Sequence, residues 1–124
     1  MKKIIVSRHP AAVEFVAERL GGFVDGGRVV IRHEPLNVNV FDVDVNGNPF
    51  PSAPDEVIPV VALATAEDVR GAVVYGNIPL HLAASAAHVW AIEFDGAPPR
   101  GTEYGVEEMK SAGARLRRYK VEAT

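Results

Sequence analysis

The chain has 124 residues, of which 48% are hydrophobic and 23% charged, as in one folded domain rather than a disordered chain. Thirteen basic and sixteen acidic residues give a net charge of −3, which argues against binding of long duplex nucleic acid. Cysteine is absent, which excludes disulfides, zinc ribbons, iron–sulfur clusters and thiol nucleophiles. The apolar run near the N-terminus is too short for a signal peptide or membrane span, so we expect a soluble, cytoplasmic protein without membrane contact.

The first segment has the pattern of a strand, a polar turn and a helix. Residues 4–6 (IIV) are a short apolar run typical of a buried strand. Apolar residues recur at helical spacing over 12–20, Pro10 suits the first turn of a helix, and two glycines suit its end. The polar run Ser7-Arg8-His9-Pro10 therefore lies at a strand-to-helix turn.

A second unit repeats this order later in the chain. Residues 72–75 favour a strand, 76–79 a polar turn with a proline, 80–88 an alanine-rich helix, and 88–94 another strand. Parallel strands joined by crossover helices place both turns at the carboxyl ends of the strands, on one sheet edge. Ligands of open α/β folds bind at that edge.

The segment 28–60 is expected to be a β-rich insertion, either a hairpin at a sheet edge or a dimer contact. Residues 29–31 are strand-like, valines alternate with polar residues over 37–45, and Asn46-Gly47 is a strong turn signal. The following prolines exclude a long helix.

The remaining segments predict a helical turn at 65–68, a helix ending at Gly113 and a strand-like tail. Neither an internal repeat nor a linker is evident, so we expect one domain over residues 1–124. The predicted fold is α/β, with an open, mainly parallel sheet and flanking helices.

The first turn could hold a phosphate. A helix N-terminus offers free amides and a positive dipole end; Arg8 would add a bidentate donor, Ser7 a hydroxyl and His9 a group that titrates near neutral pH. The alternative is structural: Ser7 caps the helix and Arg8 pairs with a surface carboxylate. The spacing alone leaves both open.

The second turn offers Asn77 and His81, each with a structural alternative. Asn77 can cap the following helix, and a lone histidine among alanines is often a packing residue. His33 and His88 are expected to be structural or solvated. The histidine spacing gives no metal-site signal, and the glycine pairs match neither a triphosphate nor an NAD motif, so no metal and no cofactor are expected.

Basic residues near the C-terminus form a further cluster. Arg100 follows two prolines in a loop, and the tail carries Arg115, Arg117, Arg118 and Lys120. Such a run is usually a solvated strand face, but with a polyphosphate ligand it could supply a second pocket wall.

Three segments resemble one known family. The opening SRHPAAVEF resembles an S/T-R-H-P-G-A motif, VVYGNIPLHLAA resembles a strand-G-T-L-P-V-H-L-A-A motif, and PRGTEYGVEEMKSAGARLRRYKV resembles an R-G-R-E-L-S, E-E-L, G-A-R-L and Y-x-V pattern. These motifs are similar to those of the Csx-sixteen family of small type III CRISPR accessory proteins. The chain departs from them at Ala11, where the family has glycine, and in its longer segment 28–60.

The resemblance implies a Rossmann-like (CARF-like) homodimeric ring nuclease that opens cyclic oligoadenylate, with cyclic tetra-adenylate as the expected ligand. RNA carries its own nucleophile, because a ribose 2′-hydroxyl can attack the adjacent phosphorus without a metal. The expected catalytic residues are Arg8, which would stabilise charge, and His9 and His81, whose base and acid roles remain open. The expected ligand-binding residues are Ser7, Pro10, Asn77, Pro79 and Arg100.

Three other interpretations remain open. The same pocket could bind the messenger without cleaving it, as a sponge or sensor. A phosphatase is conceivable, since R-H after a first strand is similar to the R-H-G of histidine phosphatases, although Pro10 replaces the glycine. The chain could also be a structural domain that assembles through residues 28–60.

Overall fold

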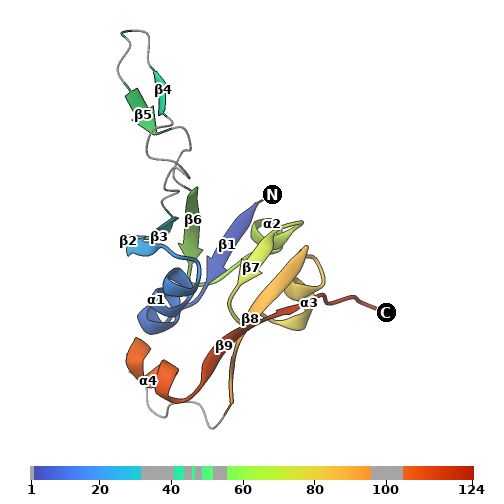
Figure 1. Cartoon of the computed structure of the whole chain (residues 1–124). Coiled ribbons are helices and arrows are strands. Elements are labelled where there is room, and N and C mark those ends of the chain that lie inside the picture. The colour runs from blue at the N-terminus through green and yellow to red at the C-terminus, as the bar shows by residue number, and fades with distance from the viewer. Residues whose placement is uncertain (1, 32–40, 44–45, 47–48, 52–55, 96–104) are drawn as a thin grey trace.

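The fold was obtained as a computed structural model that describes residues 2–31, 41–43, 46, 49–51, 56–95 and 105–124 (Figure 1). The elements, in chain order, are β1 (Lys3–Val6), α1 (Pro10–Arg19), β2 (Phe23–Asp25), β3 (Arg28–Ile31), β4 (Phe41–Val43), β5 (Pro49–Pro51), β6 (Glu56–Val61), α2 (Ala66–Val69), β7 (Val73–Tyr75), α3 (Leu80–Ala83), β8 (His88–Phe94), α4 (Val106–Ser111) and β9 (Ala114–Tyr119).

Seven of the described strands form one open sheet in the order β2-β3-β6-β1-β7-β8-β9. The four central strands, β6, β1, β7 and β8, are parallel to one another. The outer strands β2 and β3 on one side and β9 on the other run antiparallel to their neighbours. The expectation of an open α/β sheet is therefore confirmed, but the sheet is mixed rather than mainly parallel. Sequence patterns identify strands better than their directions: a tight turn reverses the chain between β2 and β3, whereas longer segments that contain other elements join β3 to β6 and β8 to β9.

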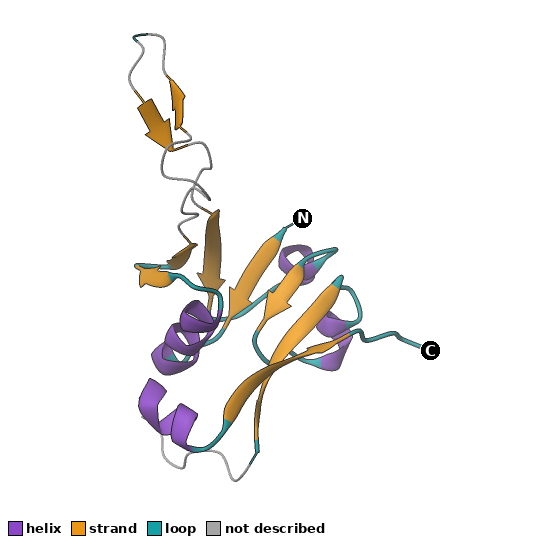
Figure 2. Ribbon diagram, viewed as in Figure 1, coloured by secondary structure: helices purple, strands orange, loops and turns teal. Residues whose placement is uncertain are grey.

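Helices cover both faces of the sheet (Figure 2). On β1, Ile5 faces α1 and packs with Val13 and Val16, whereas Ile4 and Val6 face the side that carries α2 and α3. This alternation follows from the two-residue period of a strand. A third cluster joins α1 to α4 and β9 through Phe15 and Met109, whose side chains are fully buried.

The segment 28–60 is only in part an insertion. Its ends, β3 and β6, belong to the main sheet, and β6 lies directly beside β1. Between them, β4 and β5 form a separate antiparallel hairpin, with Asn46 in the turn as its sequence predicts. A β-rich composition indicates strands, but it does not show which of them pair with strands distant in the chain.

The second unit has the predicted order but a shorter helix. The expected helix over 80–88 ends at Ala83. The next residues bond to the loop before β7 instead, since Ala87 donates to the carbonyl of Ala72 and Gly71 donates to that of Ser85. The predicted helical turn after Thr65, the helix before Gly113 and the strand-like tail appear as α2, α4 and β9. No helix in the described ranges is long and apolar enough to span a membrane.

Candidate functional site at the carboxyl ends of the central strands

A crevice opens where the chain leaves the sheet in opposite directions. The loop after β1 leads to α1 on one face, whereas the loops after β6 and β7 lead to α2 and α3 on the other. Such a reversal in an open α/β sheet separates neighbouring loops and makes room for a ligand. A cavity of about 630 Å³ lies at this point, within the range of small-molecule sites.

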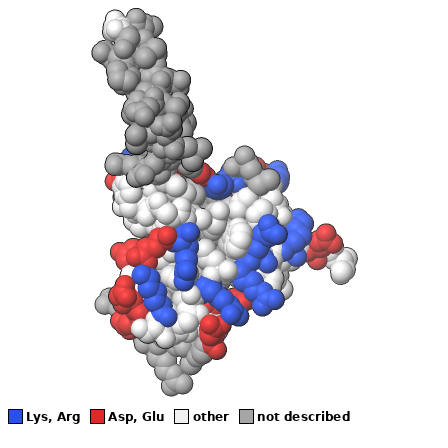
Figure 3. Space-filling view, viewed as in Figure 1, with Lys and Arg blue, Asp and Glu red and all other residues white. Residues whose placement is uncertain are grey.

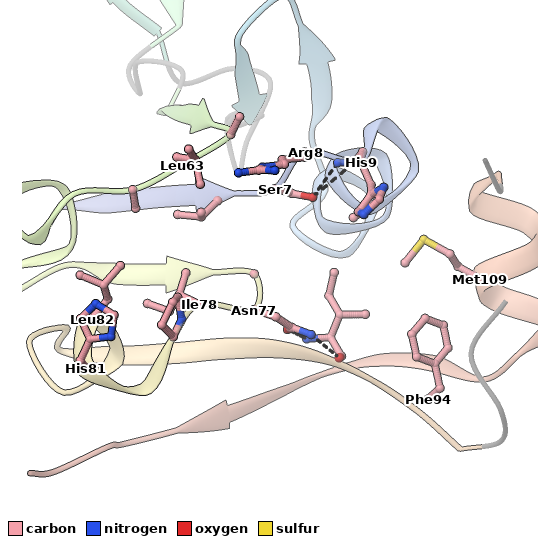
Figure 4. A pocket seen from close by; sticks show the side chains of 17 residues that line it. Ser7, Arg8, His9, Leu63, Asn77, Ile78, His81, Leu82, Phe94 and Met109 are labelled. Carbon is pink, nitrogen blue, oxygen red and sulfur yellow. Dashed lines mark hydrogen bonds between the residues drawn. The ribbon is translucent and has the colours of Figure 1, made fainter. Parts of the chain in front are cut away.

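Both predicted turns line this cavity (Figure 4). Ser7, Arg8 and His9 come from the β1–α1 turn, and Asn77, Pro79 and His81 from the β7–α3 turn. Of the remaining sequence candidates, Pro10 is the first residue of α1 and is not among the lining residues, and Arg100 lies outside the described residues.

Gly76 allows the two turns to approach each other, and the sequence analysis did not single it out. Its φ is +129°, and a Cβ on it would lie 2.1 Å from the carbonyl oxygen of Val6. Its N–H donates to the carbonyl oxygen of Trp90 at 2.9 Å, which continues the β7–β8 pairing past the end of β7. A glycine directly after a short apolar strand was the available signal for such an approach.

Ser7 shapes the first turn rather than capping the helix. Its Oγ accepts a hydrogen bond from the His9 N–H at 3.1 Å, and its own N–H donates to the carbonyl of Val61 on β6. Helix α1 has no side-chain cap, and its N-cap residue is His9. The predicted capping role of Ser7 is therefore wrong. Pro10 has no N–H, and the N–H groups of Ala12 and Val13 donate to the His9 carbonyl, so the start of α1 offers an anion chiefly its positive dipole end.

Arg8 is exposed at the cavity. No carboxylate among the described residues lies within ion-pair distance of its guanidinium. The alternative in which Arg8 pairs with a surface carboxylate is thus not what the described part of the chain shows. An unpaired guanidinium next to a helix N-terminus offers a planar set of donors to a phosphate.

Asn77 holds the second turn against β8. Its Oδ1 accepts from the N–H of Ile92 at 2.8 Å, and its Nδ2 donates to the carbonyl of the same residue at 3.3 Å (Figure 4). The side-chain amide therefore makes the two hydrogen bonds to β8 that the backbone of a further β7 residue would make. The N-cap of α3 is Pro79, so the predicted capping role of Asn77 is wrong. One Nδ2 hydrogen remains for a ligand.

The two candidate histidines lie on different parts of the cavity. His9 is at the start of α1 and His81 is in the first turn of α3, and Figure 4 shows them on opposite sides. Both side chains are exposed to solvent. Within one copy of the chain they therefore do not form a contacting acid–base pair.

Much of the remaining lining is apolar and was not predicted. It includes Leu63 after β6, whose side chain is 69% exposed, and Ile78 and Leu82 of the second turn. Phe94 and Met109 close the end near α4. The cavity thus combines phosphate-type donors with surfaces suited to a flat ring. No group of three or more potential metal ligands gathers in the described ranges.

The basic tail does not contribute to this cavity. Arg115 of β9 pairs with Asp95, directly after β8, at 2.5 Å, and Arg117 of β9 pairs with Glu93 of β8 at 3.8 Å. Neither they nor Arg118 and Lys120 are among the lining residues. Their expected alternative role as a second pocket wall is therefore not found here.

A comparison with protein-family models finds one match over more than half of the chain. Residues 53–122 match the family described as "Putative CRISPR-associated protein (Cas_VVA1548)". This chain belongs to that family. The matched Cas_VVA1548 segment contains β6, the β7–α3 turn and the C-terminal strands, but not the β1–α1 turn. No curated protein and no solved structure matches the chain.

Membership of Cas_VVA1548 makes the chain a CRISPR-associated protein, in agreement with the broader part of the sequence resemblance. The segment that carries the match supplies Asn77, Pro79 and His81 to the cavity. Ser7, Arg8 and His9 lie outside it, so their place in the site rests on the geometry of the first turn.

Proposed function

We propose that this CRISPR-associated protein is a ring nuclease that binds and cleaves cyclic oligoadenylate, with cyclic tetra-adenylate as substrate, and so ends type III CRISPR signalling. The observation that carries the proposal is Arg8, whose guanidinium has no carboxylate partner among the described residues and lies beside the start of α1, in a cavity shared with the β7–α3 turn. The parallel central strands with helices on both faces support a Rossmann-like, CARF-like relationship.

The two kinds of lining correspond to the two parts of a nucleotide. The Arg8 guanidinium and the Ser7 hydroxyl offer donors to a phosphate, and the start of α1 adds its positive dipole end. Leu63, Ile78 and the apolar end of the cavity offer surfaces to an adenine ring. An acidic protein can bind such a ligand, because its cations need only lie along one pocket.

The chemistry needs one in-line displacement. The 2′-oxygen of a ribose attacks the adjacent phosphorus as its proton passes to a base, and the P–O5′ bond breaks as O5′ gains a proton. The products are a 2′,3′-cyclic phosphate and a free 5′-hydroxyl on a linear chain. We assign charge stabilisation on the phosphorane to Arg8, and the proton transfers to His9 and His81.

A homodimer would supply a matching set of groups to the ring. A cyclic tetranucleotide has four phosphates in a near-fourfold arrangement, and a twofold axis through its centre would present two equivalent turns. Since His9 and His81 are apart within one copy, a second copy also offers a way for one histidine of each to act on the same bond. The proposed assembly is therefore a dimer around the ligand.

The test is multiple-turnover incubation with labelled cyclic tetra-adenylate in EDTA, using the wild type, Arg8→Ala and His9→Ala. Linear products ending in 2′,3′-cyclic phosphate, lost in both variants, are expected. Arg70→Ala and His88→Ala are matched controls, because Arg70 and His88 do not line the cavity, and they should retain turnover. If the wild type neither binds nor cleaves cyclic tetra-adenylate, the proposal is overturned.

A second candidate is a sponge that binds the same messenger without turnover. The separation of His9 and His81 favours it, because the two candidate proton-transfer groups lie on opposite sides of the cavity within one copy of the chain. A sponge would bind one ring per site and stop, whereas an enzyme would continue under excess substrate.

A further inference from the structure

A second surface of the sheet has the features of a stacking site. We propose that the face around Trp90 binds single-stranded nucleic acid, with a base on the Trp90 ring and the adjacent phosphates on arginines. We call it the Trp90 face, and it consists of Arg19, Tyr75, His88, Trp90 and Arg118. It is distinct from the turn cavity and does not depend on the function proposed for that cavity.

The strand register builds this face. Tyr75 on β7 is opposite Trp90 on β8, and Trp90 is opposite Arg118 on β9. Residues directly opposite each other in a sheet point to the same side. That side is the one covered by α1, since Tyr75 and Trp90 pack with the cluster that contains Val13 of α1.

The rings lie side by side on the sheet. The Tyr75 and Trp90 ring planes differ by 8°, with centroids 6.4 Å apart, and His88 meets Trp90 edge-on at 6.5 Å. Tyr75 is buried, and Trp90 is partly exposed. A cavity of about 330 Å³, a size that accommodates a nucleobase, lies over this platform between α1 and β9.

Uncompensated cations border the rings. The Arg118 guanidinium lies 5.9 Å from the centre of the Trp90 ring, and Arg19, at the end of α1, lines the cavity. Neither arginine has a carboxylate partner within the described part of the chain, whereas Arg115 and Arg117 do. Figure 3 shows Lys and Arg side chains gathered on the β8–β9 side of the molecule.

Single-stranded nucleic acid matches this combination better than other partners. Aromatic rings on a sheet stack unpaired bases, and flanking arginines bind the phosphates that connect them. A duplex hides its base faces, and the acidic chain lacks the extensive basic surface that a duplex requires. An acidic peptide would use the arginines but not the ring platform.

Trp90 is also the reporter for the experiment, because it is the one tryptophan of the sequence. The probe is a single-stranded oligoadenylate of about six nucleotides, a length within the range of known stacking sites. Titration should quench the Trp90 fluorescence to saturation. A duplex RNA of equal length and a polyglutamate peptide should bind at least tenfold more weakly.

Two variants test the assignment by anisotropy of a labelled oligoadenylate. Trp90→Leu should weaken binding about tenfold or more, through loss of stacking. Arg118→Gln keeps the ring and should lower the slope of log Kd against log salt by about 0.7, as for one lost phosphate contact. Arg70→Gln, directly after α2 at the opposite face of the sheet, should change neither value. If Trp90→Leu does not fold, as judged by circular dichroism, Arg118→Gln still decides.

The proposal is overturned by saturating probe that leaves the fluorescence unchanged, by unaltered affinity in Arg118→Gln, or by polyglutamate binding as tightly as RNA. The last outcome would indicate a protein partner instead. Because Trp90 does not line the turn cavity, quenching of its fluorescence locates the bound strand on the Trp90 face.

Discussion

Gly76 and Val6 hold the two turns of the cavity together, because the backbone of one occupies the space that a side chain on the other would need. A Cβ on Gly76 would lie 2.1 Å from the Val6 carbonyl oxygen, and the φ of +129° is itself unfavourable for other residues. Gly76→Ala should therefore lower the free energy of unfolding by roughly 2–4 kcal/mol. Chemical denaturation measures this. Gly27, which has open space around it, is the control, and Gly27→Ala should change stability by less than about 1 kcal/mol. Equal effects at the two positions would contradict the close approach.

Asn77 is expected to stabilise the second turn through its two hydrogen bonds to Ile92. Asn77→Ala leaves the Ile92 N–H and carbonyl without that partner, and it should lower the free energy of unfolding by about 1–3 kcal/mol. Ser85→Ala, an exposed change in the same unit, should have little effect. Denaturation of both variants checks this, and an unchanged midpoint for Asn77→Ala would show that the turn is held by other contacts.

The hydrogen bonds at the start of α2 predict that the free energy of unfolding falls in acid. The Thr65 N–H donates to Asp68 and, together with the Thr65 hydroxyl, lowers the pKa of that carboxyl. Because the folded-state pKa is below the unfolded one, the contribution is present at neutral pH and is lost as the pH falls through the folded-state pKa.

The measurement is the difference in unfolding free energy between the wild type and Asp68→Ala across that acidic range. The difference should be largest near neutral pH and shrink in acid. Glu14→Ala removes an exposed carboxylate from α1 and serves as the control. A difference for Asp68→Ala that is independent of pH would exclude the ionised capping contact.

Arg8→Lys tests whether the geometry of the guanidinium matters beyond its charge. Lysine keeps the charge but lacks the planar pair of donors, so the rate of ring opening in single turnover should fall about 10- to 100-fold while ligand binding changes less. Arg70→Lys is the matched control. An unchanged rate in Arg8→Lys would assign Arg8 only to attraction of the ligand.

The strand, turn and helix of the first unit, and the sheet edge that the two turns share, could be predicted from sequence. The spacing of apolar residues and the presence of turn-forming residues are signals within a short stretch of chain. Strand pairing could not be predicted. β6 lies beside β1 although 49 residues (7–55) lie between the two strands, and the alternation of valines indicates a strand without indicating its neighbour. The polar residues of both turns were found because they follow strands. Gly76 and Met109 were missed, since their roles depend on the approach of distant backbone and on α4 packing near the cavity.

The strand at the end of the sheet also limits how copies of this protein can associate. An edge strand leaves backbone groups unpaired and can recruit another chain, which leads to aggregation, unless charge or short length opposes it. β9 carries three arginines on consecutive or alternate positions, 115, 117 and 118, and β2 at the opposite end has only three residues. Two β9 strands brought together would place these cations against one another. Continuation of the sheet into a neighbouring molecule is therefore opposed at one edge by the charge of β9 and at the other by the short length of β2.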